Sequence, residues 1–69
     1  MSKLDNHPLT VGELIEKLAR QEKDMLVAVS NEKELVYGAM IDEMLRTIWL
    51  LDKYSLEYLQ RRGEINCLL

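Results

Sequence analysis

The hydrophobic positions between Asn31 and Arg62 form the most extensive pattern in the chain. When these residues are placed on a helical wheel at about 100° per residue, nearly all apolar side chains fall on one broad arc. The opposite strip is narrow and polar; it contains Asp42, Arg46, Lys53, Glu57 and Gln60. An ordinary surface helix has an apolar stripe little wider than about 100°, and this arc is about twice as wide. The pattern predicts one long amphipathic helix over about 31–62 that a single neighbouring helix cannot cover.

The length of this predicted helix indicates self-association. Thirty-two helical residues extend about 48 Å, whereas a compact chain of 69 residues has a diameter of roughly 28 Å. A straight helix would therefore project beyond its own domain. Either it kinks, near Gly38 or Ser55, or it packs along another subunit, and we expect a homo-oligomer.

A second helix is predicted near the amino terminus. Thr10 and Glu13 have the spacing of a capping box, in which each side chain accepts a hydrogen bond from the other residue's backbone N–H. Leu9 and Leu14 occupy the positions of a hydrophobic staple. The apolar residues that follow recur at helical spacing. We expect a capped helix over about 10–22.

Between these helices lies the short apolar run Met25–Val29. Its length and its two valines favour an extended segment over a piece of helix. A strand needs a partner for its backbone groups. That partner would be a second copy of itself across a dimer axis, or a hairpin return through Glu34–Tyr37. In the hairpin alternative, the long helix would begin at Gly38.

The predicted fold class is therefore mainly α, in one small oligomerising domain over 1–69. Residues 1–8 and 64–69 are expected to be loose ends, with Gly63 stopping the long helix. The alternative is an α+β fold with a hairpin at 25–37.

Composition and charge exclude several classes of protein. The net charge of −3 argues against a protein that mainly grips phosphate backbones. No apolar run reaches the 18 or more residues of a membrane span, and the amino terminus lacks the layout of a signal peptide. A single cysteine, Cys67, fits a reducing cytoplasm. We expect a cytoplasmic protein without a membrane partner.

The residues that could carry function are mostly interface residues. Aromatic and methionine side chains on the predicted long helix are typical anchors of subunit or partner interfaces. Asp52 falls inside the apolar arc, where a carboxylate needs a hydrogen-bonded or cationic partner. The candidate oligomer or partner interface consists of Met40, Ile41, Met44, Leu45, Ile48, Trp49, Leu51, Asp52, Tyr54 and Tyr58.

Two other kinds of site are weakly represented in the sequence. A thin basic element could contact nucleic acid, although acidic residues interrupt it; its members are Arg46, Lys53, Arg61 and Arg62. The only histidine, His7, lies beside a proline, and no nucleophile, base and orienting group occur at a catalytic spacing. We expect no enzyme activity, no cofactor and no metal site.

Residues 9–29, from Leu9-Thr10-Val11-Gly12-Glu13-Leu14-Ile15-Glu16-Lys17-Leu18 to Asp24-Met25-Leu26-Val27-Ala28-Val29, resemble the start of many small phage and prophage accessory proteins. In those proteins a capped helix leads into a short strand. The resemblance implies a phage or prophage origin, and with it a role in binding a host protein or a small signalling ligand. No functional residue carries over from it.

The sequence therefore predicts a small, non-enzymatic interaction or regulatory protein that binds a host protein or a small ligand through a homo-oligomeric helical surface. The alternative is a nucleic-acid-binding transcriptional regulator that uses the basic residues named above.

Overall fold

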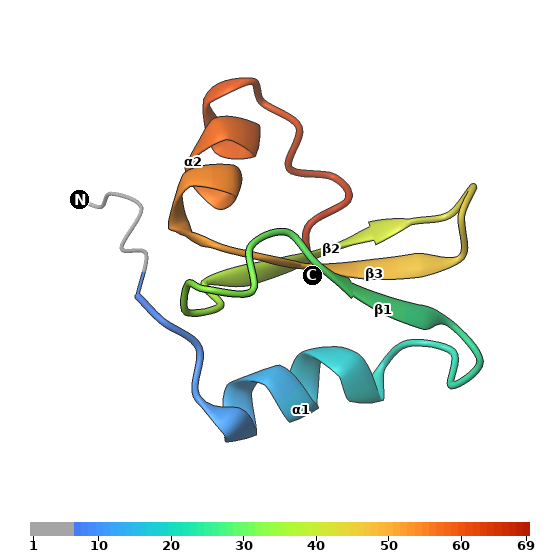
Figure 1. The fold of residues 1–69 in the computed structure, drawn as a ribbon. Coiled ribbons are helices and arrows are strands. Elements are labelled where there is room, and N and C mark those ends of the chain that lie inside the picture. The colour runs from blue at the N-terminus through green and yellow to red at the C-terminus, as the bar shows by residue number, and fades with distance from the viewer. Residues whose placement is uncertain (1–6) are drawn as a thin grey trace.

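The computed structural model describes residues 7–69, which form two short helices and a three-stranded sheet (Figure 1). In chain order the elements are α1 (Val11–Ala19), β1 (Leu26–Val29), β2 (Gly38–Asp42), β3 (Thr47–Leu51) and α2 (Lys53–Arg61). The fold is a small α+β arrangement.

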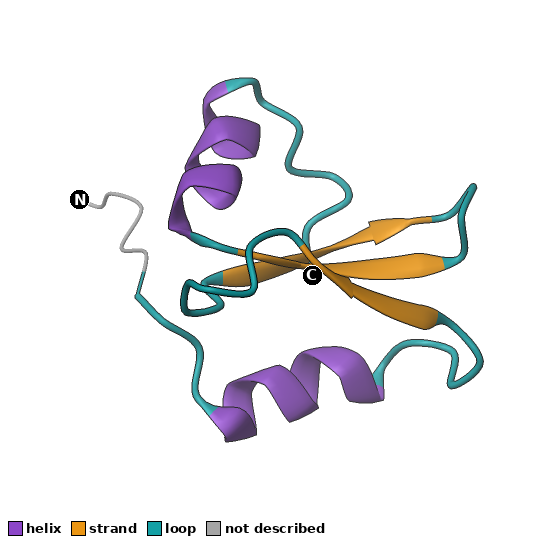
Figure 2. Ribbon diagram, viewed as in Figure 1, coloured by secondary structure: helices purple, strands orange, loops and turns teal. Residues whose placement is uncertain are grey.

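The sheet has the order β1-β3-β2, so the last strand in sequence lies in the centre. β2 and β3 form an antiparallel hairpin, and β1 pairs with β3 in parallel. The two helices lie on opposite faces of the sheet, α1 on one and α2 on the other (Figure 2). The structure thus has three layers, with the sheet between the helices.

The amino-terminal half of the chain follows the sequence pattern. The Thr10 N–H donates to Glu13 Oε1 at 2.9 Å, and the Glu13 N–H donates to Thr10 Oγ1 at 3.2 Å. The predicted capping box is therefore confirmed, although α1 ends at Ala19 and not near residue 22. The extended segment predicted at 25–29 is confirmed as β1.

The predicted long helix over 31–62 is wrong, and so is the mainly α fold class. That stretch folds as a loop, the β2–β3 hairpin and the short helix α2. Because β2 and β3 lie under covering elements, both of their faces carry apolar side chains. Strands that are apolar on both faces read as continuous hydrophobic runs, and on a helical wheel such runs fill an unusually wide arc. The unusual width of the apolar arc on the helical wheel therefore indicates strands and not a helix.

The hairpin turn at residues 43–46 depends on local polar groups. The Asp42 carboxylate accepts a hydrogen bond from the Leu45 N–H at 3.2 Å, and Arg46 adopts a left-handed conformation with φ of 51°. The Arg46 guanidinium reaches back to Glu22 Oε1 at 2.6 Å and Asp24 Oδ1 at 2.8 Å. These contacts join the hairpin to the segment that precedes β1.

The alternative hairpin at 25–37 is also wrong, because the partner of β1 is β3. Leu26 lies opposite Thr47, and Val29 lies opposite Leu50. Strand β1 pairs in parallel with β3, which lies later in the chain. The sequence predicted no such parallel pairing.

The ends of the described chain are tied to the rest of the structure. The Leu9 N–H donates to the Val36 carbonyl at 2.8 Å. At the other end, the Ile41 N–H donates to Cys67 O and the Leu69 N–H donates to Ala39 O, both at 2.9 Å. The tail predicted to be loose therefore pairs with the outer edge of β2. Of the predicted loose lead-in, residues 1–6 lie outside the described residues.

The core of this fold is small. Only four apolar residues of the described chain are buried: Ala39, Ile48, Leu51 and Leu56. Helix α1 has no buried residue. The length argument for an oligomer does not hold, since there is no long helix to overhang. Many large apolar side chains nevertheless remain exposed.

Candidate functional site

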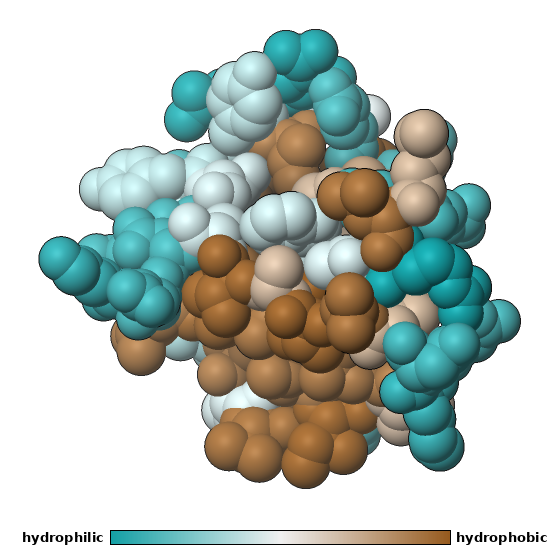
Figure 3. Space-filling model, turned by 45° about the vertical axis from the view of Figure 1, so that its right-hand side comes forward, coloured by the Kyte–Doolittle hydropathy of each residue, from teal (hydrophilic) through white to brown (hydrophobic). Residues whose placement is uncertain are grey.

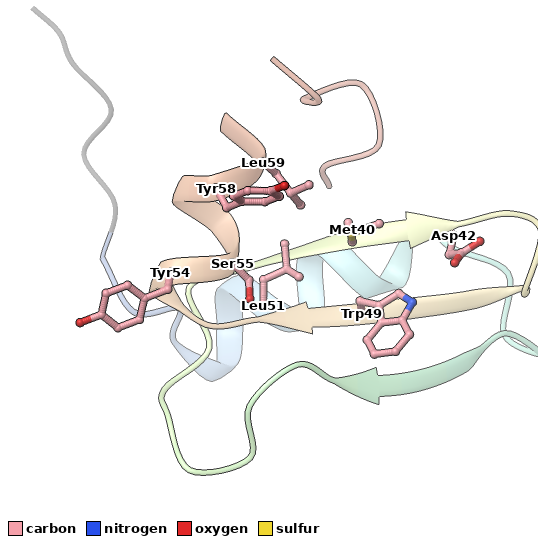
Figure 4. Close-up of a pocket in the computed structure, with 8 residues that line it drawn as sticks. All are labelled: Met40, Asp42, Trp49, Leu51, Tyr54, Ser55, Tyr58 and Leu59. Carbon is pink, nitrogen blue, oxygen red and sulfur yellow. The ribbon is translucent and has the colours of Figure 1, made fainter. Parts of the chain in front are cut away.

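A largely apolar groove of about 540 Å³ lies between α2 and one face of the hairpin. Figure 4 shows its side chains coming from the strands below and the helix above. We call it the α2 groove; its lining consists of Met40, Asp42, Trp49, Leu51, Tyr54, Ser55, Tyr58 and Leu59.

The floor of the α2 groove is set by the register of β2 and β3. Met40 lies directly opposite Trp49, and Gly38 lies opposite Leu51. Since side chains alternate between the faces of a sheet, these paired positions share one face. Met40 and Trp49 are half-buried, whereas Leu51 is buried under α2. The floor offers a flexible thioether and an indole, both well suited to contact with apolar groups.

The wall of the groove is one side of α2. Tyr54 and Tyr58 are four residues apart, as are Ser55 and Leu59, so each pair is stacked along the helix. The Tyr54 ring points away from the other lining side chains, whereas Leu59 and Tyr58 lie above the floor (Figure 4). Tyr54 remains 74% exposed and Tyr58 54%. The groove is therefore open to solvent along the helix.

The Tyr58 ring is in contact with the guanidinium group of Arg62. The Arg62 Nη1 donates to the Tyr58 hydroxyl at 2.9 Å, and the Arg62 guanidinium carbon lies 5.5 Å from the ring centroid. The Tyr58 hydroxyl and Glu64 raise the pKa of Arg62. A ring fixed in this way is pre-ordered for binding, because less side-chain freedom is lost on contact.

The groove has one charged group, the Asp42 carboxylate, at the end nearest the hairpin turn. Asp42 is half-buried and its Oδ1 accepts from the Leu45 N–H. A carboxylate at the end of an otherwise apolar groove favours a ligand with a cationic group there.

Asp52 orients the groove wall because it caps α2. Its Oδ1 accepts from the Ser55 N–H at 2.9 Å, and its own N–H donates to Ser30 Oγ at 3.1 Å. The hydrogen bonds from Ser55 lower the pKa of Asp52, and Asn31 adds to this from the loop after β1. Asp52, a residue that is only 6% exposed, connects α2 with the loop after β1.

The structure divides the predicted interface residues into several groups. Five of them line the α2 groove: Met40, Trp49, Leu51, Tyr54 and Tyr58. The other five residues lie elsewhere. Ile48 is 2% exposed in the core, Ile41 shares its face, Asp52 caps α2, and Met44 and Leu45 are exposed in the hairpin turn.

The predicted nucleic-acid residues do not form one surface. Arg46 lies in the hairpin turn and is bonded to Glu22 and Asp24, which raise its pKa. Lys53 begins α2 just after the opposite end of β3, and Arg61 and Arg62 lie at the carboxyl end of α2, about 12 Å further along the helix. The five-residue strand β3, about 16 Å long, separates Arg46 from Lys53.

Three lining residues were not among the predicted interface residues: Asp42, Ser55 and Leu59. A signal for part of this arrangement was present. Asp52, directly after an apolar run, is a favourable N-cap residue for a helix that starts at Lys53. Recognition of that start would have divided the stretch into strand and helix.

Within residues 7–69, no group of three or more His, Cys, Asp or Glu side chains is arranged to hold a metal ion. Neither α1 nor α2 has the length and apolar character of a membrane-spanning helix. Comparison with known proteins finds no family model, no curated protein and no solved structure that matches the chain.

Proposed function

We propose that the protein is a non-enzymatic interaction module that binds an amphipathic helix of a partner protein in the α2 groove. The observation that carries this proposal is the cluster of Trp49, Tyr58 and Met40 beside a single, short covering helix. Trp and Tyr supply much of the binding energy at protein interfaces, and Met adapts to different partners.

The geometry of the groove favours a helix as the bound element. Helix α2 packs on β2 and β3 but has only nine residues, about 13.5 Å of helix. From Leu51 to the position of Asp42 the groove floor spans about 13 Å, which accommodates between two and three helical turns. A second helix beside α2 would complete the layer on this face of the sheet. Helix-in-groove binding of this kind uses apolar anchors at i, i+3, i+4 and i+7.

The charge of the groove favours partner helices that carry a basic residue. The groove ends at the Asp42 carboxylate, and the chain has a net charge of −3. A partner helix with a Lys or Arg beyond its apolar stripe would place that cation near Asp42. Opposite charges at the rim of an interface favour association and set orientation more than they add affinity.

A host protein remains the partner class that the resemblance to phage accessory proteins implies, and regulation by sequestration of that partner is part of the proposal. A small signalling ligand fits less well, because small-molecule sites usually bury most of the ligand. The α2 groove is open along Tyr54 and Tyr58. The nucleic-acid alternative has less support, because Arg46 lies apart from Lys53, Arg61 and Arg62.

A peptide selection tests the proposal. A displayed library of random peptides of about 16 residues, four helical turns, is selected against the immobilised chain. We expect enriched peptides to have helically spaced apolar residues and a basic residue. We expect Trp49→Ala and Tyr58→Ala each to weaken binding about ten-fold or more, as for central interface anchors.

The matched control is Leu35→Ala, which removes an apolar side chain that is 65% exposed and outside the groove. Leu35→Ala should change the affinity for the selected peptides by no more than about two-fold, because substitutions at the surface usually have small effects on free energy. Circular dichroism verifies that each variant is folded. A selection that enriches no peptide, or peptides that bind the Trp49 and Tyr58 variants as tightly as the parent chain, would refute the proposal.

A further inference from the structure

The outer edge of β1 presents backbone groups without partners in the described structure. The Leu26 N–H donates to Arg46 O at 3.0 Å and the Ser30 N–H donates to Leu50 O at 2.9 Å, so these residues face β3. In a strand, alternate residues direct their backbone groups to opposite edges. Val27 and Val29 therefore direct their N–H and C=O groups away from the sheet, and both side chains are exposed.

This edge lacks the features that keep sheet edges from pairing. Natural edge strands are usually blocked by charged residues, proline, bulges or a covering segment. Met25–Val29 contains no charged residue and no proline. The opposite side of the sheet differs, because the tail at Cys67–Leu69 bonds to β2. Within residues 7–69, one edge is thus closed by the chain itself, and no segment is bonded to the other.

Apolar side chains of α1 extend the open edge into a surface. The Lys17 Nζ donates to Leu69 O at 2.8 Å, so this side of α1 faces the tail and the β2 edge. Val11 and Ile15 lie about 160° around the helix from Glu13 and Lys17, toward the β1 edge. Val11 is 78% exposed and Ile15 59%.

Figure 3 shows a broad hydrophobic area on the side of the molecule where α1 and β1 lie. We call this the β1 edge surface and define it by Val11, Ile15, Leu26, Val27 and Val29, nearly half of the large apolar side chains that are exposed in residues 7–69. Val27 and Val29 lie on the α1 face of the sheet, and Leu26 lies at the same edge on the opposite face, because Val27 pairs with Ile48 and Leu26 with Thr47.

We propose that the β1 edge surface pairs with the same surface of a second copy of this chain, so that β1 and its symmetry mate join two sheets into one. An antiparallel pairing centred on Ala28 would place Val27 opposite Val29 of the second copy, and Val29 opposite its Val27. Both pairs are hydrogen-bonded pairs, and they would use all the outward-facing N–H and C=O groups of these two valines.

The side chains suit this arrangement. At the centre, Ala28 would face its counterpart in a non-hydrogen-bonded pair, where side chains are closest, and alanine is small enough to fit there. A two-fold axis normal to the sheet would put both α1 helices on the same face. Val11 and Ile15 of each copy would then meet across the axis and cover the paired valines.

The size of the surface predicts a modest affinity. A fully exposed Val, Leu or Ile corresponds to about 60–120 Å² of apolar area, so the five side chains expose roughly 200–350 Å² per copy. With its polar surroundings such an interface would bury about 600 Å² per partner, the low end for specific complexes. That is roughly a tenth of the 5239 Å² surface of the chain. The dimer should therefore depend on concentration.

Two measurements on the full chain test the pairing, independently of the α2 groove. Sedimentation analysis from about 1 µM to 1 mM, a span that includes weak complexes, should show a shift from 8.1 kDa toward twice that mass. Amide hydrogen exchange should show that the Val27 and Val29 N–H groups become protected as the dimer forms. A chain that stays monomeric throughout, or a dimer in which these two amides exchange as openly as in the monomer, would overturn the proposal.

A substitution pair adds a second test. Val27→Lys places a charge on the edge, and Ile65→Lys is its control because both side chains are 56% exposed and Ile65 lies in the tail. The first should weaken dimerisation about ten-fold or more, as blocking charges do at sheet edges, and the second should not. If Val27→Lys is folded and dimerises as well as the control, the proposal is wrong. If Val27→Lys does not fold, the exchange of the Val27 and Val29 amides in the unmodified chain tests the pairing instead.

Discussion

Gly38 and Leu56 are in contact at the point where α2 packs on the start of β2. A Cβ atom at Gly38 would lie 3.1 Å from Leu56 Cδ1 and 3.3 Å from Leu56 Cδ2. Leu56 is buried at 6% exposure and is the buried residue of α2. The absence of a side chain at Gly38 thus lets the helix approach the sheet and sets the position of the α2 groove wall.

The first prediction concerns this contact. Gly38→Ala should lower the free energy of unfolding by about 1 kcal/mol, because overpacking of 1–3 kcal/mol exceeds the gain from a stiffer unfolded chain. Gly12→Ala is the control, since nothing lies within 4 Å of that position in α1. It should raise stability by about 0.5–1 kcal/mol. Thermal melts of both variants measure the effect, and a stabilised Gly38→Ala would show that α2 does not pack closely on β2.

The second prediction concerns the small core. Ile48 is 2% exposed in the central strand. Ile48→Ala should lower the free energy of unfolding by about 2–5 kcal/mol, comparable with the upper limit of about 3–5 kcal/mol for a core in a chain of this size. The variant should be largely unfolded at 37 °C by circular dichroism. Retention of a cooperative melt with an unchanged midpoint would place the core elsewhere.

The third prediction is a dependence of stability on pH. The Ser55 hydrogen bonds lower the folded-state pKa of Asp52, and the unfolded chain has the ordinary carboxyl value near 4. The unfolded state therefore binds the proton first as pH falls. The contribution of Asp52 is fully present above about pH 4 and is lost as pH falls through the folded-state pKa.

Asp52→Asn isolates this contribution. Asparagine also caps helices well but does not titrate, so the variant should lose less stability than the parent chain below about pH 4. Glu13 has a lowered pKa for a similar reason, its hydrogen bonds with Thr10, and it titrates in both proteins. Melts at a series of pH values measure the difference. Identical pH profiles would mean that Asp52 is not hydrogen-bonded as an ionised cap.

The fourth prediction concerns the left-handed residue of the hairpin turn. Arg46 has φ of 51°, a conformation that glycine adopts without strain and other residues do not. Arg46→Gly and Arg46→Ala both lose the contacts with Glu22 and Asp24, but only the glycine variant relieves the strain. Arg46→Gly should therefore melt several degrees above Arg46→Ala. Equal melting temperatures would show that the turn adopts another conformation.

Local signals in the sequence predicted the amino-terminal half of the fold. The capping box at Thr10 and Glu13 and the valines of β1 act over a few residues, and the structure retains both. The carboxyl-terminal half could not be inferred in the same way. The parallel pairing of Val27 with Ile48 joins residues far apart in sequence, and no short-range pattern encodes such a contact.

The candidate site was predicted in part. Its residue types indicated an interface, although the element that carries them was expected to be one long helix. Trp49, Tyr54 and Tyr58 were selected as interface anchors, and all three line the α2 groove, with the Tyr54 ring directed away from the other two. Asp52 was identified as a carboxylate that needs a partner. Its role as a helix cap required a break before Lys53, which the continuous apolar arc concealed.

The central claim, that the α2 groove binds a partner helix, is tested most directly at Trp49. It is the only tryptophan of the chain, so its indole N–H gives a single side-chain signal in a ¹⁵N correlation spectrum. On titration with a peptide from the selection, we expect that signal and the amide signals of Met40 and Tyr58 to shift together with one saturation curve, while Leu35 stays unchanged. Saturable peptide binding that leaves the Trp49 indole and Tyr58 signals in place would contradict the account.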